Sequence, residues 1–196
     1  MKTLFILVLL TVVNCSYSQK TSFKLAIGDQ AATIYPFTRI FDKKFYPVVQ
    51  TGIEYKYTEK GNFNFSQDIV IQYKYHPYLG HSFGIFSQAA GSYRFRIPFF
   101  ALLGFGVGIL GEFPADNAYK LNLKNEYVKV RPMHPMAGAS MSFIIGYEFK
   151  NRFSIFSSYQ YGIQFPFNKT IAILPTEMVF LGTKIKLFKK RDDERP

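Results

Sequence analysis

The sequence has one cysteine and no tryptophan, and it has no long apolar run beyond its first residues. The single cysteine is Cys15. If the segment that carries it is removed, the remaining chain cannot form disulfides, zinc–thiolate sites or a cysteine nucleophile. A membrane helix needs roughly 20 continuous apolar residues, and no later stretch offers them. If this chain spans a membrane, it must therefore do so as a closed barrel, because only helices and barrels satisfy their backbone hydrogen bonds in lipid.

The first 18 residues have the order of a secretory signal peptide. A positive start at Lys2 precedes the apolar run Leu4–Val13, and small and polar residues end at Ser18. This order predicts export, with cleavage after Ser18. Two alternatives remain open. One is an uncleaved anchor, although the run is short for a bilayer. The other is a lipoprotein modified at Cys15, although Asn14 departs from the usual small residue before a lipidated cysteine.

The charge balance is strongly basic, with a formal net charge of +11 and a pI near 9.6. A basic chain can bind nucleic acid, but an exported protein rarely meets it. Anionic lipid head groups and lipopolysaccharide are therefore the expected acidic partners, and no nucleic acid is expected.

Hydrophobicity in the rest of the chain alternates with a period of two, which is typical of strands with two different faces. In 152–164, one set of alternate positions carries Phe, Ile and Tyr, and the other carries mostly Ser, Gln and Gly. Eight segments follow this pattern: 22–28, 48–57, 63–75, 82–96, 99–113, 136–149, 152–164 and 176–188. Glycine at alternate positions of 99–113 is costly in an ordinary strand but suits the inner wall of a narrow barrel.

The connections and the aromatic residues indicate a membrane barrel. Long connections at 29–47, 114–135 and 165–175 alternate with short turns, as in outer-membrane barrels, and only the short connection 76–81 departs from this order. Phe and Tyr flank both ends of the apolar faces, where aromatic girdles form. The sequence thus predicts an all-β, eight-stranded antiparallel up-and-down transmembrane β-barrel over 19–188, with a charged periplasmic tail at 189–196. The alternative is a soluble periplasmic β-barrel that binds an apolar ligand.

This pattern resembles the small eight-stranded outer-membrane barrels of the OmpA-transmembrane and OmpX kind, over nearly all of residues 20–188. The resemblance implies the outer membrane of a Gram-negative cell, porin-like architecture, and contact with the barrel-assembly machinery. Such barrels typically end on an aromatic residue. Phe188 has that place here, but eight further residues follow it.

Charged residues on the polar strand faces are expected inside the barrel, where they would pair and plug the lumen. The open alternative is a narrow ion path. The predicted lumen charges are Lys24, Glu54, Lys56, Asp68, Lys74, Arg94, Arg96, Glu112, Glu148, Lys184 and Lys186.

Catalytic chemistry has weak support. The segment 80–84 matches G-x-S-x-G, but the buried strand and helix that give this motif meaning are missing. A lipid or lipopolysaccharide hydrolase that uses Ser82 and His81 remains an alternative, since a serine nucleophile needs a nearby histidine. The histidines form no metal site by spacing and the glycines form no phosphate loop, so no cofactor is expected.

The connection 114–135 carries Lys120, Lys124, Lys129 and Arg131, a basic patch suited to lipopolysaccharide phosphates or an acidic partner. An ordinary solvated loop is the alternative. The most direct interpretation is an outer-membrane barrel with a structural or surface-interaction role and no evident catalysis.

Overall fold

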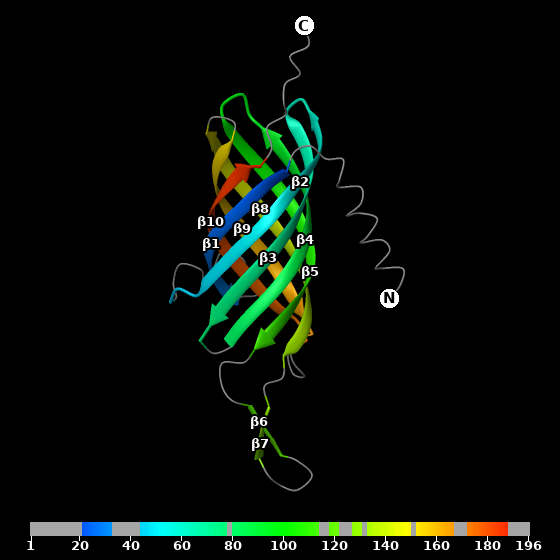
Figure 1. Ribbon diagram of the computed structural model, residues 1–196, viewed down its shortest axis with the longest axis vertical. Coiled ribbons are helices and arrows are strands. Elements are labelled where there is room, and N and C mark those ends of the chain that lie inside the picture. Colours follow the sequence, from blue (N-terminus) through cyan, green and yellow to red (C-terminus); the bar gives the residue numbers. More distant parts are fainter. Residues whose placement is uncertain are drawn as a thin grey trace, which may run out of the picture.

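The computed structural model describes residues 21–32, 44–77, 80–113, 118–121, 127–130, 133–149, 152–166 and 172–187. Eight strands of this part close into a barrel and two shorter ones form a hairpin beyond one end of it (Figure 1). The barrel strands are β1 (Thr21–Ala32), β2 (Pro47–Lys60), β3 (Phe63–His76), β4 (Gly80–Arg94), β5 (Phe99–Phe113), β8 (His134–Phe149), β9 (Phe153–Phe165) and β10 (Leu174–Lys186). The hairpin strands are β6 (Ala118–Leu121) and β7 (Tyr127–Val130).

Each barrel strand pairs antiparallel with its neighbours in the barrel, in the order β1-β10-β9-β8-β5-β4-β3-β2, and β1 pairs with both β2 and β10. The prediction of an eight-stranded antiparallel up-and-down barrel is therefore confirmed. Closure leaves no unpaired sheet edge, which is the property that lets a β-structure exist in lipid.

Two details of the prediction are wrong. Strand β4 ends at Arg94, so Arg96 lies in the following turn, exposed, and is not a lumen charge. The connection between β5 and β8 was expected to be a loop, yet it contains the β6–β7 hairpin, with Lys120 opposite Val128 and Tyr119 opposite Lys129. The predicted signal peptide and the tail 189–196 lie outside the described residues, as does Phe188.

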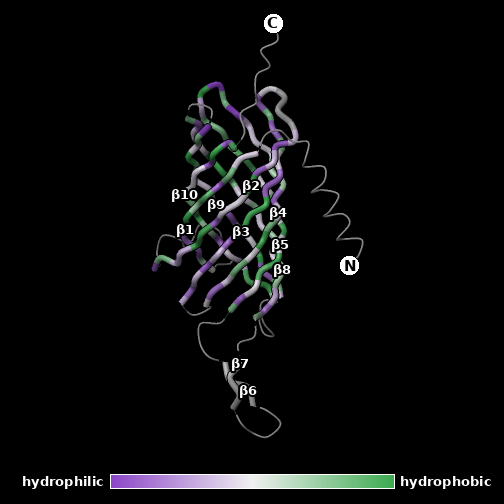
Figure 2. Tube along the Cα trace, in the orientation of Figure 1, coloured by the Kyte–Doolittle hydropathy of each residue, from purple (hydrophilic) through white to green (hydrophobic). Residues whose placement is uncertain are grey.

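The two faces of each strand differ as the alternation predicts. Along β9, Phe153, Ile155 and Phe165 are exposed, whereas Ser154, Phe156 and every second residue after them are buried. Figure 2 shows hydrophobic and hydrophilic positions alternating along the strands. The exposed set on the outer wall is mostly apolar, with Phe105, Val107, Ile109 and Leu181 each at least 60% exposed. Such an outer wall avoids water only if lipid covers it.

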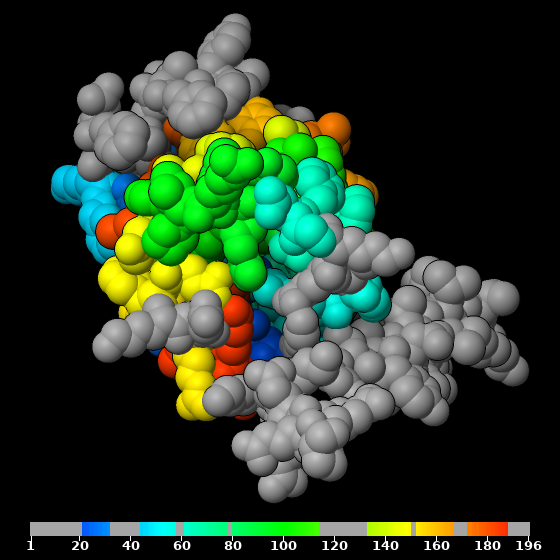
Figure 3. Space-filling model, turned by 90° about the horizontal axis from the view of Figure 1, so that it is seen from above, coloured from blue at the N-terminus to red at the C-terminus, as the bar shows by residue number. Residues whose placement is uncertain are grey.

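Short turns join the strands at one end of the barrel. The tightest, between β2 and β3, places Gly61 at a φ of 63°, which favours glycine because it has no Cβ. Figure 3 looks onto this end, where the turns β2–β3 (cyan), β4–β5 (green) and β8–β9 (yellow) gather around the barrel. The hairpin of β6 and β7 lies beyond the opposite end (Figure 1). In outer-membrane barrels the short turns usually face the periplasm and the longer loops face outward.

No helix among the described residues is long and apolar enough to cross a membrane.

Candidate functional site

The barrel interior holds a buried network of charges contributed by four neighbouring strands. Glu54 on β2 lies 3.0 Å from the Nζ atoms of both Lys24 and Lys184, and the Lys24 Nζ atom also lies 2.6 Å from Asp68 Oδ2. The Glu54 and Asp68 side chains are each only 2% exposed. Two cations and two anions therefore neutralise one another inside the wall, which offsets part of the cost of removing them from water.

The strand register explains how these four residues meet. Lys24 stands opposite Lys184, and Glu54 stands opposite Asp68. Residues of like charge therefore stand directly opposite each other. The attractive contact between Lys24 on β1 and Glu54 on β2 is diagonal, because the residue directly opposite Glu54 is Ser22. The arrangement depends on β1 pairing with β10, the two strands at opposite ends of the barrel sequence.

A second charge group lies nearer the short turns. Glu148 forms an ion pair with Lys186 and lies 3.2 Å from Arg94 Nη2. The Arg94 side chain is 43% exposed, so this group is open to solvent on one side. Lys56 is buried on the lumen side as well. The structure places the side chains of these residues, and of Lys24, Asp68 and Lys184, on the lumen side of their strands, with pairings that the sequence alone does not predict.

Apolar side chains also pack inside the lumen. Phe86, Leu110 and Met136 form one cluster. Phe156, Phe180, Leu102 and Ile144 belong to another. Large side chains face glycines on neighbouring strands: a Cβ placed on Gly182 would lie 2.4 Å from Phe156 Cζ. Glycine and bulky residues therefore alternate so that the interior packs, and the two interior cavities described are small, at about 20 and 30 Å³.

The mouth of the lumen at the hairpin end carries a ladder of four polar residues. Lys74 on β3 is opposite Ser82 on β4, Ser82 is opposite Glu112 on β5, and Glu112 is opposite His134 on β8. Lys74 and Ser82 are buried, with 5% and 9% of their surface exposed. They line a small cavity together with Glu112, Gln164 and Thr176.

The structure separates the predicted catalytic pair. Ser82 faces the lumen, whereas His81 faces outward, where its Nδ1 lies 2.7 Å from the Tyr73 hydroxyl and its ring packs beside Tyr75. Adjacent residues of a strand point to opposite faces, so Ser82 and His81 cannot form a serine–histidine pair. Among the described residues, no cluster of three or more His, Cys, Asp or Glu side chains could hold a metal ion.

The predicted basic patch falls on the hairpin and its flanks. Lys120 lies in β6 and Lys129 in β7. Lys124 and Arg131 lie outside the described residues.

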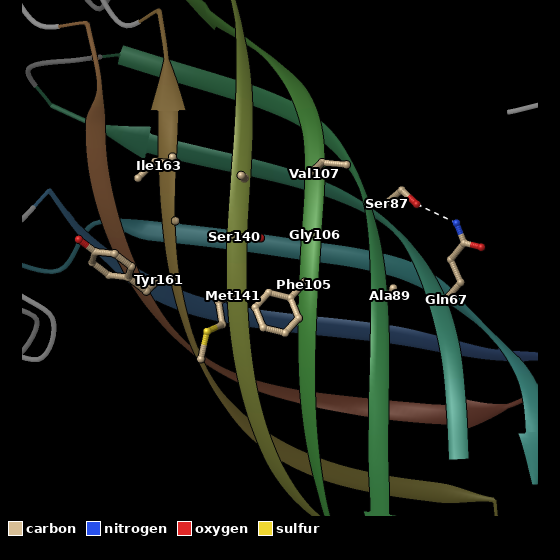
Figure 4. Close-up of a pocket in the computed structure, with 12 residues that line it drawn as sticks. Gln67, Ser87, Ala89, Phe105, Gly106, Val107, Ser140, Met141, Tyr161 and Ile163 are labelled. Atoms are coloured by element: carbon tan, nitrogen blue, oxygen red, sulfur yellow. Dashed lines mark hydrogen bonds between the residues drawn. The ribbon is translucent and has the colours of Figure 1, made fainter. Parts of the chain in front are cut away.

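The outer wall has a groove of about 490 Å³ between β5, β8 and β9. Figure 4 shows Phe105, Met141 and Tyr161 standing around the small residues Gly106 and Ser140, with Gln67 and Ser87 to one side. Gln67 donates a hydrogen bond to Ser87 Oγ at 2.9 Å and accepts one from the Tyr57 hydroxyl. The polar pair is thus internally satisfied on a wall that is otherwise apolar.

Comparisons with known proteins identify the fold. No protein-family model and no curated protein matches the chain. Neisserial surface protein A is similar in structure, with a TM-score of 0.51 and 12% identity over 85% of this chain and 96% of that one. The outer membrane enzyme PagL has a TM-score of 0.50 and 11% identity over 84% and 98% of the two chains. The N-terminal β-barrel domain of Pseudomonas aeruginosa OprF has a TM-score of 0.48 and 12% identity over 86% and 98%.

The protein is therefore a small eight-stranded β-barrel of the outer-membrane type. Its closed sheet, apolar outer wall and packed polar interior fit the outer membrane as its location. At these identities the similarity establishes the fold, and the function has to be argued from the residues of this chain.

Proposed function

We propose that this protein is an outer-membrane barrel of a Gram-negative bacterium whose task is to present its long extracellular segment, and with it the β6–β7 hairpin, at the cell surface. The observation that carries the proposal is the contrast between the filled interior of the barrel and the hairpin beyond its end. Ion pairs and apolar side chains pack inside the described lumen, while the hairpin of β6 and β7 lies beyond the barrel end (Figure 1). A rigid scaffold that holds a projecting loop is a common arrangement for binding proteins.

The packed lumen argues against the channel alternative. Phe86, Leu110 and Met136 form a buried apolar cluster on β4, β5 and β8, and ion pairs between Lys24, Glu54 and Lys184 occupy the interior beside β1, β2 and β10. An eight-stranded barrel is only wide enough for its own side chains, so a conducting path would require several of them to move together.

The proposed partner of the hairpin is an anionic surface group, with lipopolysaccharide phosphate as the first candidate. The basic residues Lys120, Lys124, Lys129 and Arg131 support this, because ammonium and guanidinium groups bind phosphate through charge-assisted hydrogen bonds. The net charge of +11 favours the same class of partner.

Single-cysteine labelling tests the orientation. In a Cys15→Ser background the chain has no other thiol. Lys120→Cys in the hairpin should react in intact cells with a maleimide that cannot cross membranes. Asn62→Cys, in the β2–β3 turn, should react only after the outer membrane is opened. Labelling of Asn62→Cys but not of Lys120→Cys in intact cells would invert the proposed topology. Reaction of both in a periplasmic extract would refute a membrane barrel.

Neutralising the basic patch tests the partner. The fourfold variant K120Q/K124Q/K129Q/R131Q should retain less lipopolysaccharide on purification in mild detergent than the natural chain. The fourfold variant K44Q/K60Q/R96Q/R152Q, with all four positions outside the patch, removes the same charge and is the control for charge alone. Equal retention by all three proteins would contradict the assigned patch without affecting the barrel.

A further inference from the structure

The mouth cavity of the lumen is lined by two buried residues, Lys74 and Ser82, whose side chains make no hydrogen bond within the described part of the chain. Among the described residues, the Lys74 ammonium makes no hydrogen bond and no ion pair within 4.0 Å, although Glu112 attracts it electrostatically from across the mouth. The Ser82 hydroxyl oxygen is buried and has no hydrogen-bond partner. The two residues are direct neighbours across β3 and β4.

Unpartnered groups of this kind are unusual inside a protein. A buried ammonium or hydroxyl without a partner costs free energy, so native structures nearly always pair them. Three other lysines of the same interior, Lys24, Lys184 and Lys186, each contact a carboxylate. Lys74 and Ser82 thus form a set of donors that the chain itself does not satisfy.

We propose that Lys74 and Ser82 bind one oxyanion group, a carboxylate or a phosphate, that enters the barrel from the extracellular side. The ammonium supplies charge and up to three donors, and the hydroxyl supplies a fourth. The cavity volume of about 20 Å³ is room for one or two water-sized groups, which suits the charged end of a ligand. Gln164 and Thr176 line the opposite side of the same cavity.

Other ligand classes fit less well. A cation would meet the Lys74 ammonium, and an apolar group would leave both donors unpaired. A nucleophilic role for Ser82 would require a base in hydrogen-bond contact with its hydroxyl, and the Ser82 oxygen has no such contact in the described part of the chain. Binding is therefore the role that these two residues support.

Glu112 gives the proposal a distinctive consequence. Its carboxylate faces the same cavity and would repel a bound anion. Glu112→Gln should therefore tighten anion binding by several-fold, whereas the removal of a residue that contacts the anion should weaken it. A generic effect of damage to the mouth would weaken binding in every variant.

The test uses the full refolded chain in detergent, titrated with sodium phosphate and with sodium acetate at constant ionic strength and followed by calorimetry. Lys74→Met should weaken binding at least roughly tenfold, since hydrogen bonds to charged groups contribute about 1.5–3 kcal/mol. Ser82→Ala should weaken it by a smaller factor, and Lys74→Arg should retain it. The matched control, Lys186→Met, removes the same charge from the periplasmic end of the lumen and should bind like the natural protein.

A gel that compares boiled and unboiled samples shows whether each variant is folded. If neither anion binds the natural chain, a third arm uses lipopolysaccharide with and without its phosphates in lipid nanodiscs. Binding to free phosphate or acetate that depends on Lys74 would support a small-molecule ligand. Binding only to phosphorylated lipopolysaccharide, again dependent on Lys74, would support a group carried by a lipid. Absence of binding in all arms, or binding equal in Lys74→Met and Lys186→Met, would overturn the proposal.

Discussion

Glu54 holds the buried charge network together, since it contacts both Lys24 and Lys184 and is almost completely buried. Glu54→Gln would leave Lys184 in a wall without its carboxylate partner. Removing one member of a buried pair typically costs about 3–5 kcal/mol. We therefore expect a lower urea midpoint for Glu54→Gln in lipid vesicles, with an unchanged barrel spectrum once folded.

Two further variants distinguish the stability cost of losing a buried charge from that of losing a more exposed one. Glu148→Gln removes a carboxylate whose cationic partners Arg94 and Lys186 are 43% and 25% exposed, so its cost should be smaller than that of Glu54→Gln. The double variant Glu54→Gln/Lys184→Met removes an uncompensated cation and should recover part of the loss. Equal losses for Glu54→Gln and Glu148→Gln would contradict the assigned network.

The same residues show how far sequence can predict a site. The alternation of polar and apolar positions along each strand predicts from the sequence that Glu54, Asp68 and Lys184 lie on the inner face of the barrel. It cannot predict that Glu54 bridges two lysines, because Lys184 lies 130 residues away and the contact depends on barrel closure. The pairing of Ser82 with Lys74 cannot be predicted for a related reason. The residue next to Ser82 in the sequence is His81, whereas the residue that shares its face is the cross-strand neighbour Lys74.

At the scale of elements, glycines decide how closely the strands pack. Gly182 on β10 lies between Phe156 on β9 and Ala26 on β1, and an added Cβ would approach them to 2.4 and 2.7 Å. Gly182→Ala should therefore destabilise the barrel by about 1–3 kcal/mol, the usual cost of overpacking. On the outer wall, a Cβ on Gly91 would lie 3.7 Å from its nearest neighbours, so Gly91→Ala should cost little. Urea unfolding of the two variants side by side checks this, and a larger loss for Gly91→Ala would disprove the packing account.

The hairpin is an element that the barrel does not need. Strands β6 and β7 pair with each other and with no barrel strand. Replacing 116–131 with a short Gly-Ser linker should change the free energy of unfolding of the barrel by no more than about 0.5 kcal/mol, as is usual for surface changes away from special features. A chain that no longer folded after this replacement would show that the hairpin has a structural role.

Sequence could predict the eight long strands because each offers six or more alternating positions. It missed β6 and β7 because four residues provide only two positions per face. The strand AYKL also shows no clear alternation that would separate it from a loop. Short strands depend on their partner for stability, and a pattern within one segment does not contain that partner.

For the molecule as a whole, the decisive question is which medium covers the outer wall. A soluble barrel with the same strands would have to expose Phe105, Val107 and Ile109 to water, since they point away from the lumen and are at least 60% exposed. The apolar groove between β5, β8 and β9 adds to that surface (Figure 4). Exposed apolar areas of this extent are covered by a partner or by lipid. Closure of the sheet and the outward orientation of its apolar side chains thus lead to one environment, the bilayer.

A single outward charge distinguishes the two environments. Val107 lies near the middle of β5 and is 66% exposed. In lipid, Val107→Lys should cost about 2–4 kcal/mol, as lysine does near the midplane of a bilayer. Met133→Lys, just before β8 at the extracellular rim, should cost only about 0–1 kcal/mol because charge is tolerated near the interface. In water the same lysine at position 107 would be solvated and nearly neutral in effect. Urea unfolding in lipid vesicles measures both variants, and equal midpoints for Val107→Lys and the natural chain would mean that lipid does not cover this wall.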